Sequence, residues 1–131
     1  MGFLYHNAII VLTYSRERAE AAYAKAFELF DGLAPVTAIA ETPVNSDFTF
    51  AILPDGSKEG WEPSERGDAA RDAMKAWFKE QCFEDGSCPF NWIEIGFGED
   101  DARVVDDSRA QTHADPRWLR ATARPLPTGA P

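Results

Sequence analysis

The sequence predicts an α+β fold: a ferredoxin-like, split β-α-β-β-α-β arrangement with an extra C-terminal edge strand, and two helices on one face of an antiparallel sheet. Two observations carry this prediction. Strand-like and helix-like hydrophobic patterns follow each other in that order along the chain. In addition, 131 residues with 44% hydrophobic content suffice for one domain. Right-handed crossovers then give the strand order 4-1-3-2, with the fifth strand outside the fourth. A different α+β sandwich with the same elements is the alternative.

The first half of the chain carries three of the strands and the clearest helix. The first strand is expected over residues 5–13, because residues 9–12 are apolar without interruption. Ser15 is a suitable N-cap for a helix that Gly32 ends. Strands over 36–42 and 47–53 then form a hairpin. The apolar stripe of the helix consists of Ala19, Ala22, Tyr23, Ala26, Phe27 and Phe30.

The second half predicts a helix, a strand and a short edge strand over 103–106. The helix begins at Ser64 or Asp68, ends before a turn at 84–87, and has an apolar stripe that includes Cys82. In the strand over 91–97, Ile93, Ile95 and Phe97 are expected to face the helices, which places Trp92 and Glu94 on the open face of the sheet. The predicted core contains Phe27, Phe30, Met74, Trp77, Ile93 and Ile95.

The charge distribution divides the chain into a domain over 1–107 and a Pro- and Arg-containing tail over 108–131. The net charge is −9, which argues against direct binding to nucleic acid or to an anionic membrane. The segment from Asp107 onward has two acidic residues and four arginines, whereas the preceding 106 residues have a net charge of −11. Residues after Gln111 are expected to be dispensable for folding. If this tail docks, Trp118 and Leu119 are the expected anchors.

No residue pattern predicts catalysis, a metal or a cofactor. The histidines, His6 and His113, lack metal-ligand spacing, and an enzyme that uses His6 is the least favoured hypothesis. Cys82 and Cys88 fit neither a redox motif nor a zinc site, and we expect two reduced thiols. A disulfide is the alternative, because both cysteines flank a turn. Without a signal peptide or an apolar run of membrane-spanning length, a soluble, cytoplasmic protein is expected.

Two surfaces are candidate binding sites. The first is a site for a small anion or a nucleotide at Lys58, Trp61 and Arg66. There, the Trp61 indole could stack on a base, and the two cations could bind phosphate. The open face of the sheet is the candidate partner surface, because it is partly apolar. Its expected contact residues are Trp92 and Glu94 at the centre and Glu99, Asp100 and Asp101 as a charged rim. With Asp106 and Asp107, these carboxylates form an acidic cluster that is expected to keep an exposed edge soluble, and DNA mimicry is the alternative role.

Several segments carry a resemblance to known proteins. They include Tyr5-His6-Asn7-Ala8, the run from Leu53 to Trp61, and Asn91-Trp92-Ile93-Glu94-Ile95-Gly96-Phe97-Gly98. Over residues 5–106 the chain resembles small uncharacterised proteins of tailed bacteriophages and prophages. The resemblance implies a phage protein in the cytoplasm of a bacterial host and assigns no catalytic residues.

These observations together predict a non-enzymatic phage accessory protein that binds and inhibits a host protein, most often one of antiviral defence. We also expect a homodimer or a hetero-complex through the open face. The alternatives are a protein that sequesters a small ligand or nucleotide signal, and a minor virion component.

Overall fold

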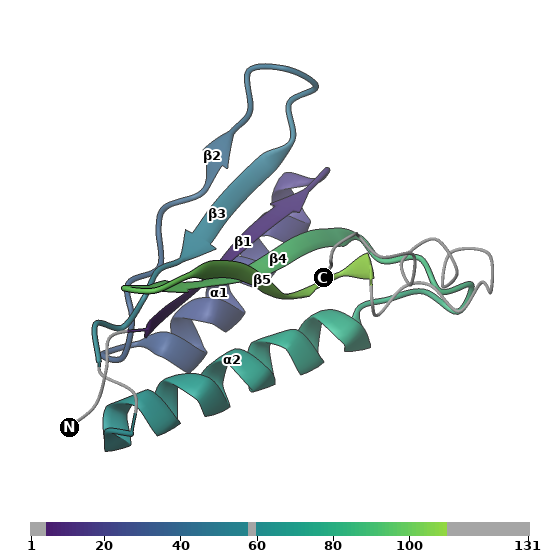
Figure 1. The fold of residues 1–131 in the computed structure, drawn as a ribbon. Coiled ribbons are helices and arrows are strands. Elements are labelled where there is room, and N and C mark those ends of the chain that lie inside the picture. The colour runs from purple at the N-terminus through teal and green to yellow at the C-terminus, as the bar shows by residue number, and fades with distance from the viewer. Residues whose placement is uncertain (1–4, 58–59, 110–131) are drawn as a thin grey trace.

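A computed structural model describes residues 5–57 and 60–109 as one α+β unit. Its elements are β1 (Tyr5–Thr13), α1 (Arg16–Phe30), β2 (Ala40–Glu41), β3 (Phe48–Ile52), α2 (Glu62–Glu80), β4 (Phe90–Gly98) and β5 (Ala102–Asp107). The strands form one antiparallel sheet in the order β2-β3-β1-β4-β5. Both helices cover the same face of this sheet (Figure 1). The predicted α+β class is therefore confirmed.

The central strand, β1, shows how the sequence distributes its apolar residues between the two faces. Ile9 and Val11 are fully buried toward the helices, whereas Ile10, between them, is 44% exposed on the other side. Successive side chains of a strand point to opposite faces, so a run that is apolar at every position supplies both faces. The face without helices is called the open face below.

Helix α1 (Arg16–Phe30) begins where the sequence predicts, but it buries fewer residues than the predicted apolar stripe contains. The Ser15 side chain accepts a hydrogen bond from the backbone N–H of Arg18 at 3.1 Å, the usual N-cap contact. The predicted core position of Phe27 is wrong, because its side chain is 52% exposed. The residues that α1 buries are Ala19, Ala22, Ala26 and Phe30. Phe27 lies one position, or about 100°, from this stripe, where it stacks on Tyr23.

Helix α2 begins earlier than predicted, with Trp61 as its N-cap and Pro63 in its first turn. Proline is favoured there because its missing N–H would have no partner in the helix. Neither Ser64 nor Asp68 is the cap, and Cys82 lies beyond the last helical residue. The residues that α2 buries are Ser64, Gly67, Ala70, Arg71, Met74 and Phe78.

The second strand is much shorter than the predicted segment over 36–42. Only Ala40–Glu41 pairs regularly with β3, and Val36 forms an isolated bridge to Ile52. Between them, the Thr37 side-chain oxygen accepts the hydrogen bond of the Ala51 backbone N–H at 2.8 Å. Because a hydroxyl takes the place of a backbone carbonyl there, the ladder is interrupted.

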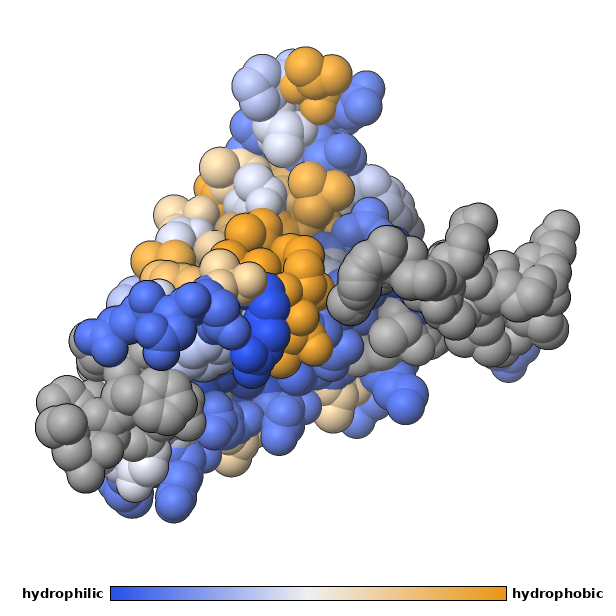
Figure 2. Space-filling view, viewed as in Figure 1, coloured by the Kyte–Doolittle hydropathy of each residue, from blue (hydrophilic) through white to orange (hydrophobic). Residues whose placement is uncertain are grey.

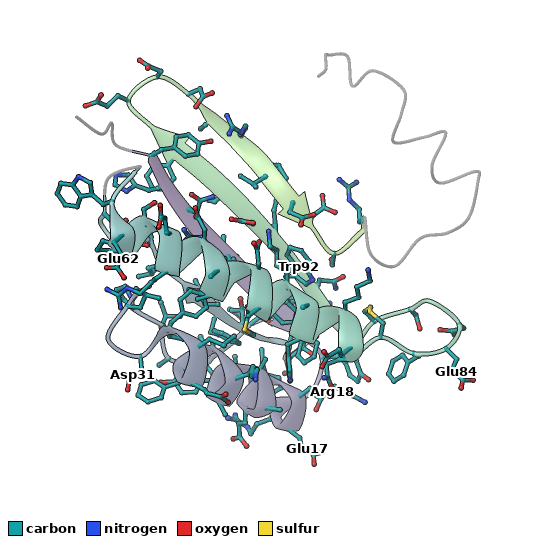
Figure 3. The ribbon with its side chains drawn as sticks, turned by 90° about the horizontal axis from the view of Figure 1, so that it is seen from below. Glu17, Arg18, Asp31, Glu62, Glu84 and Trp92 are labelled. Atoms are coloured by element: carbon teal, nitrogen blue, oxygen red, sulfur yellow. A yellow bond between two sulfur atoms is a disulfide. The ribbon has the colours of Figure 1, made fainter. Side chains whose placement is uncertain are left out.

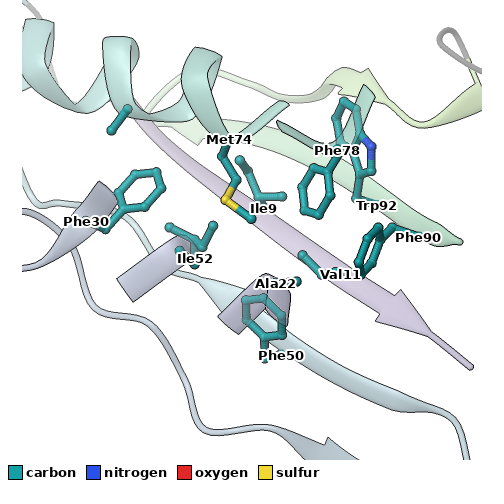
Figure 4. Close-up of a cluster of buried hydrophobic side chains, with 12 residues drawn as sticks. Ile9, Val11, Ala22, Phe30, Phe50, Ile52, Met74, Phe78, Phe90 and Trp92 are labelled. Carbon is teal, nitrogen blue, oxygen red and sulfur yellow. The ribbon is translucent and has the colours of Figure 1, made fainter. Parts of the chain in front are cut away.

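The core lies between the sheet and the two helices and is rich in aromatic rings (Figure 4). Phe78 of α2 stacks on Trp92 and contacts Phe90, with ring centroids 5.6 and 5.3 Å apart. Trp77 packs against this cluster and remains partly exposed. The predicted core positions of Phe30 and Met74 are confirmed, since both are fully buried.

The edge strand β5 pairs irregularly with β4. A register shift at Glu94/Ile95 pairs Ile95 with Val104 but Glu94 with Asp106, which leaves Val105 as an extra residue. Two backbone N–H groups at its end are bound by local side chains. Asp106 accepts from the N–H of Asp107, and Asp107 accepts from that of Arg109.

Candidate functional site

Strand β4 presents the opposite side chains to the helices from those that the sequence predicts. Trp92 is 4% and Glu94 is 3% exposed, and both lie on the helix side of the sheet. The pairing explains this, because Trp92 stands opposite Val11 and Glu94 opposite Ile9, two residues that face the helices. The predictions that Trp92 and Glu94 lie on the open face, and Ile93 and Ile95 in the core, are therefore wrong.

The buried Glu94 carboxylate is matched by three side chains. Lys75 Nζ donates to Glu94 Oε1 at 2.6 Å, and Asn7 Nδ2 donates to Oε2 at 2.9 Å. The Arg71 guanidinium lies 3.8 Å from Oε2. Arg71 and Lys75 are four residues apart, so they lie on one face of α2 and both reach the same carboxylate.

The electrostatics of Lys75 reflect this setting. Burial lowers its pKa, but the hydrogen bond and the charge of Glu94, together with the charges of Asp106 and Asp72, raise the pKa above the ordinary value. Its Nζ lies 3.5 Å from Asp106 and 3.6 Å from Asp72. The ammonium is therefore held in its charged form between α2, β4 and β5.

Arg71 extends the same network to the loop before α2. Its guanidinium lies 2.7 Å from Asp68 and 3.8 Å from Asp55, and its side chain is 6% exposed. The other oxygen of Asp55 accepts from the backbone N–H and the hydroxyl of Ser57, at 2.9 and 2.7 Å. Gly67 permits this approach, because a Cβ at that position would collide with the Asp55 carboxylate.

Each cation of this network faces carboxylates of the same chain. Glu94, Arg71 and Lys75 are largely buried and compensate one another, so removing one of these three charges would leave the other two with weaker compensation. We conclude that the network holds α2, β4 and the loop over 53–57 together, and its cations are not available to an external anion.

The open face of the sheet is apolar across β1, β4 and β5. Figure 2 shows hydrophobic side chains gathered over the sheet and hydrophilic ones over α2 below it. The register divides this face into two halves. One half, named the Phe97 half below, contains Ala8, Ile95, Phe97 and Val104. The other half is a groove around Ile10 and Ile93.

The Phe97 half is directly followed by acidic residues. Phe97 is 39% and Val104 is 54% exposed. The turn between β4 and β5 carries the exposed Glu99, Asp100 and Asp101, and Asp101 pairs with Arg103 at 3.4 Å. The structure thus places Glu99, Asp100 and Asp101 beside exposed apolar side chains, and Trp92 is not among those side chains. The role of these three carboxylates in partner binding stays a prediction.

The groove occupies the opposite half of the open face. Its volume is about 370 Å³, within the range of small-molecule pockets. The residues that line it are Ile10, Leu12, Asn91, Trp92, Ile93, Asp107, Ser108 and Arg109. Nothing in the sequence pointed to this groove, because it depends on how β1 and β4 align.

The predicted anion site is placed only in part. Lys58 lies outside the described residues, Trp61 is the half-exposed N-cap of α2, and Arg66 forms an ion pair with Glu62 at 3.0 Å. An intramolecular carboxylate thus competes for the guanidinium. Anion binding at these three residues stays a prediction.

Cys82 and Cys88 form a disulfide, so the expectation of two reduced thiols is wrong. The bond closes the loop between α2 and β4, beyond the end of α2 in Figure 3. Within this loop, Asp85 accepts from the backbone N–H and hydroxyl of Ser87, the same contacts that Asp55 makes with Ser57. The two Asp-Gly-Ser sequences therefore form matching turns.

No group of three or more His, Cys, Asp and Glu side chains able to hold a metal ion occurs within residues 5–57 and 60–109. His6 lies on the open face beside Phe97, with ring centroids 5.4 Å apart; His113 lies outside the described residues. Neither helix of the described chain is long and apolar enough to cross a membrane.

Comparison with protein-family models, with curated proteins and with solved structures finds no match.

Proposed function

We propose that this chain is a non-enzymatic phage accessory protein that binds a host protein, and inhibits it, through the Phe97 half of the open face. The observation that carries the proposal is an exposed apolar surface beside three carboxylates. Contiguous apolar surface of this kind is typical of protein-binding sites. The carboxylates of Glu99, Asp100 and Asp101 would orient a partner with cationic groups more than they would strengthen binding.

The finer description of the fold is also a proposal. We propose a ferredoxin-like topology, supported by the neighbours β4-β1-β3-β2 within the sheet and by two helices on one face. β5 is added outside β4, and β2 retains only two residues. The proposed location is the cytoplasm of the bacterial host, where the Cys82–Cys88 bond would have to resist reduction.

A capture experiment with matched variants tests the proposed function. The tagged full chain is incubated with lysate of infected host cells, and captured proteins are identified by mass spectrometry. A host protein captured by the wild-type chain should be lost with Phe97→Arg and retained with Phe27→Arg, a control that changes an exposed phenylalanine on α1. Circular dichroism establishes that both variants are folded.

The same experiment distinguishes binding from inhibition. The activity of the captured host protein is measured with and without the purified chain, and a decrease with wild type but not with Phe97→Arg supports inhibition. If Phe27→Arg abolishes capture and Phe97→Arg does not, the binding surface is α1 and the proposal is wrong.

A further inference from the structure

The groove on the open face lies where the described chain ends. Leu12 pairs with Asn91 and Ile10 with Ile93, and Ile93 in turn pairs with Asp107 of β5. Ile10, Leu12 and Ile93 therefore supply the apolar part of the floor, with Asn91 and Asp107 beside them. The last described residues, Ser108 and Arg109, form part of the wall. Ile10 is 44% exposed there, although it lies in the central strand.

The next 22 residues of the chain have the chemistry that fits this groove. Residues 110–131 contain one aspartate and three arginines, a net charge of +2, whereas residues 1–109 have a net charge of −11. Their bulkiest apolar pair, Trp118-Leu119, is flanked by Arg117 and Arg120. Trp118 follows Arg109 by nine residues, a distance of up to about 30 Å in extended chain, so the pair can reach any part of the groove.

We propose that Trp118 and Leu119 bind in the groove of their own chain. The apolar pair would cover Ile10 and Ile93, and the arginines on either side would approach the acidic body. A second copy of the described surface is less suited to the groove, because it is itself acidic and would bring like charges together. The inference concerns the groove and not the Phe97 half, so it does not rest on the proposed function.

Such docking would not be needed for folding. The core lies on the other face of the sheet, between β1, β4 and the helices. If Trp118 and Leu119 dock in the groove, they would bury Ile10 and Ile93, whereas Phe97 lies on the other half of the open face and would stay exposed.

Photo-crosslinking in the full chain tests the proposal. The variant Trp118→p-benzoylphenylalanine is irradiated at low micromolar concentration, digested and analysed by mass spectrometry. We expect crosslinks within one chain, to peptides that contain Ile10–Leu12 or Asn91–Ile93. The matched control is Leu126→p-benzoylphenylalanine, which places the same probe in the same segment, away from the proposed anchors.

Three outcomes overturn the proposal: crosslinks that join two chains, crosslinks to another part of the same chain, or a groove yield no higher than that of the control. In the chain with Trp118→p-benzoylphenylalanine, a second change, Ile93→Asp, should lower the yield of crosslinks to the groove peptides at least fivefold. The change Phe97→Asp should leave that yield unchanged. Circular dichroism checks that both are folded. The variant Trp118→Ala/Leu119→Ala should still capture the host partner, because the proposed partner surface is the Phe97 half. If this variant loses capture while Trp118→p-benzoylphenylalanine still crosslinks to the groove, only the proposed function is contradicted.

Discussion

At the scale of single residues, Glu94 determines how β4 lies on the helices. A buried carboxylate is costly unless cations and donors surround it, and Lys75, Arg71 and Asn7 provide them. The sequence contained a sign of this arrangement. Arg71 and Lys75 lie on the same face of α2 as Met74 and Phe78, and cations on an apolar stripe require a buried acid nearby.

Removing the lysine should destabilise the fold, because Glu94 would keep only Asn7 and the more distant Arg71 as partners. We expect Lys75→Met to lower the free energy of unfolding by about 3 kcal/mol, because it breaks a buried ion pair and leaves Glu94 charged. Urea unfolding measures the loss. Lys79→Met, an exposed change on the same helix, should change stability by less than about 0.5 kcal/mol. A loss equal to that of the control would show that water reaches Glu94.

The contribution of Lys75 should also depend on pH. Its pKa in the folded protein lies above the ordinary value of 10.5, so the folded state binds this proton more tightly than the unfolded state does. The stabilisation is therefore complete below pH 10.5 and is lost as the pH rises through the folded pKa. The difference in unfolding free energy between wild type and Lys75→Met should be constant from pH 7 to about 10 and should decrease above. A difference that grows with pH would contradict this sign.

At the scale of elements, the hydrophobic pattern predicts where β4 begins and ends but not which of its side chains face the helices. The bounds of β1, β4 and α1 follow closely from alternation, helical spacing and the Ser15 cap. The facing of β4 does not, because both of its parities are apolar: Phe90 and Trp92 on one, Ile93, Ile95 and Phe97 on the other. By number, the three apolar residues of the second set predict that this set faces the helices. In the structure the other set does, because Phe90 and Trp92 pack on Phe78, and Glu94 accepts a hydrogen bond from Lys75.

Alanine substitutions should separate the two parities of β4. We expect Trp92→Ala to cost about 3–5 kcal/mol, because the change leaves a cavity beneath Phe78. Phe97→Ala, on the open face, should cost less than about 1 kcal/mol. Thermal or urea unfolding of the two variants provides the comparison. Equal losses would place both residues in the core and contradict the observed facing.

The disulfide contributes at the same scale. Joining residues 82 and 88 closes a short loop, which by loop entropy stabilises the fold by about 2 kcal/mol. The variant Cys82→Ser/Cys88→Ser should lose this amount, and a reducing agent should produce a similar loss in the wild type only. If neither treatment changes the unfolding midpoint, the bond is absent in solution and the expectation of free thiols is restored.

At the scale of the whole molecule, the core and the proposed binding surfaces lie on opposite faces of one sheet. The composition predicted a single α+β unit with a partly apolar open face. It could not predict the groove, which requires the register of β1 against β4, or the short β2, where a threonine side chain replaces a backbone partner. The acidic rim was predictable because turn residues between two strands are exposed whichever way the strands face.

Truncation tests whether the segment after the domain supports the fold. A chain that ends at Gln111 should unfold within about 1 kcal/mol of the full chain, because every core residue described here precedes it. Insolubility of this shortened chain, or a much lower melting temperature, would show that the segment is part of the folded unit.

Self-association through the Phe97 half should respond to salt. With a net charge of −9 per chain, two copies repel each other, and added salt screens that repulsion. By light scattering, we expect the dimer fraction to rise with salt concentration and to be absent in Phe97→Arg. A monomer at every salt concentration would exclude a homodimer and leave a different protein as the partner.

The irregular pairing of β5 has a consequence for how such molecules can assemble. A regular edge strand offers a row of free N–H and C=O groups on which another chain can extend the sheet, the first step toward a growing fibre. Here the extra residue at Val105 interrupts that row, and Asp106 and Asp107 bind the N–H groups that follow. The opposite edge ends in two residues of β2. We therefore expect both edges of the described sheet to be poor templates for a strand of a second copy, which would limit side-by-side growth of a domain with an apolar open face.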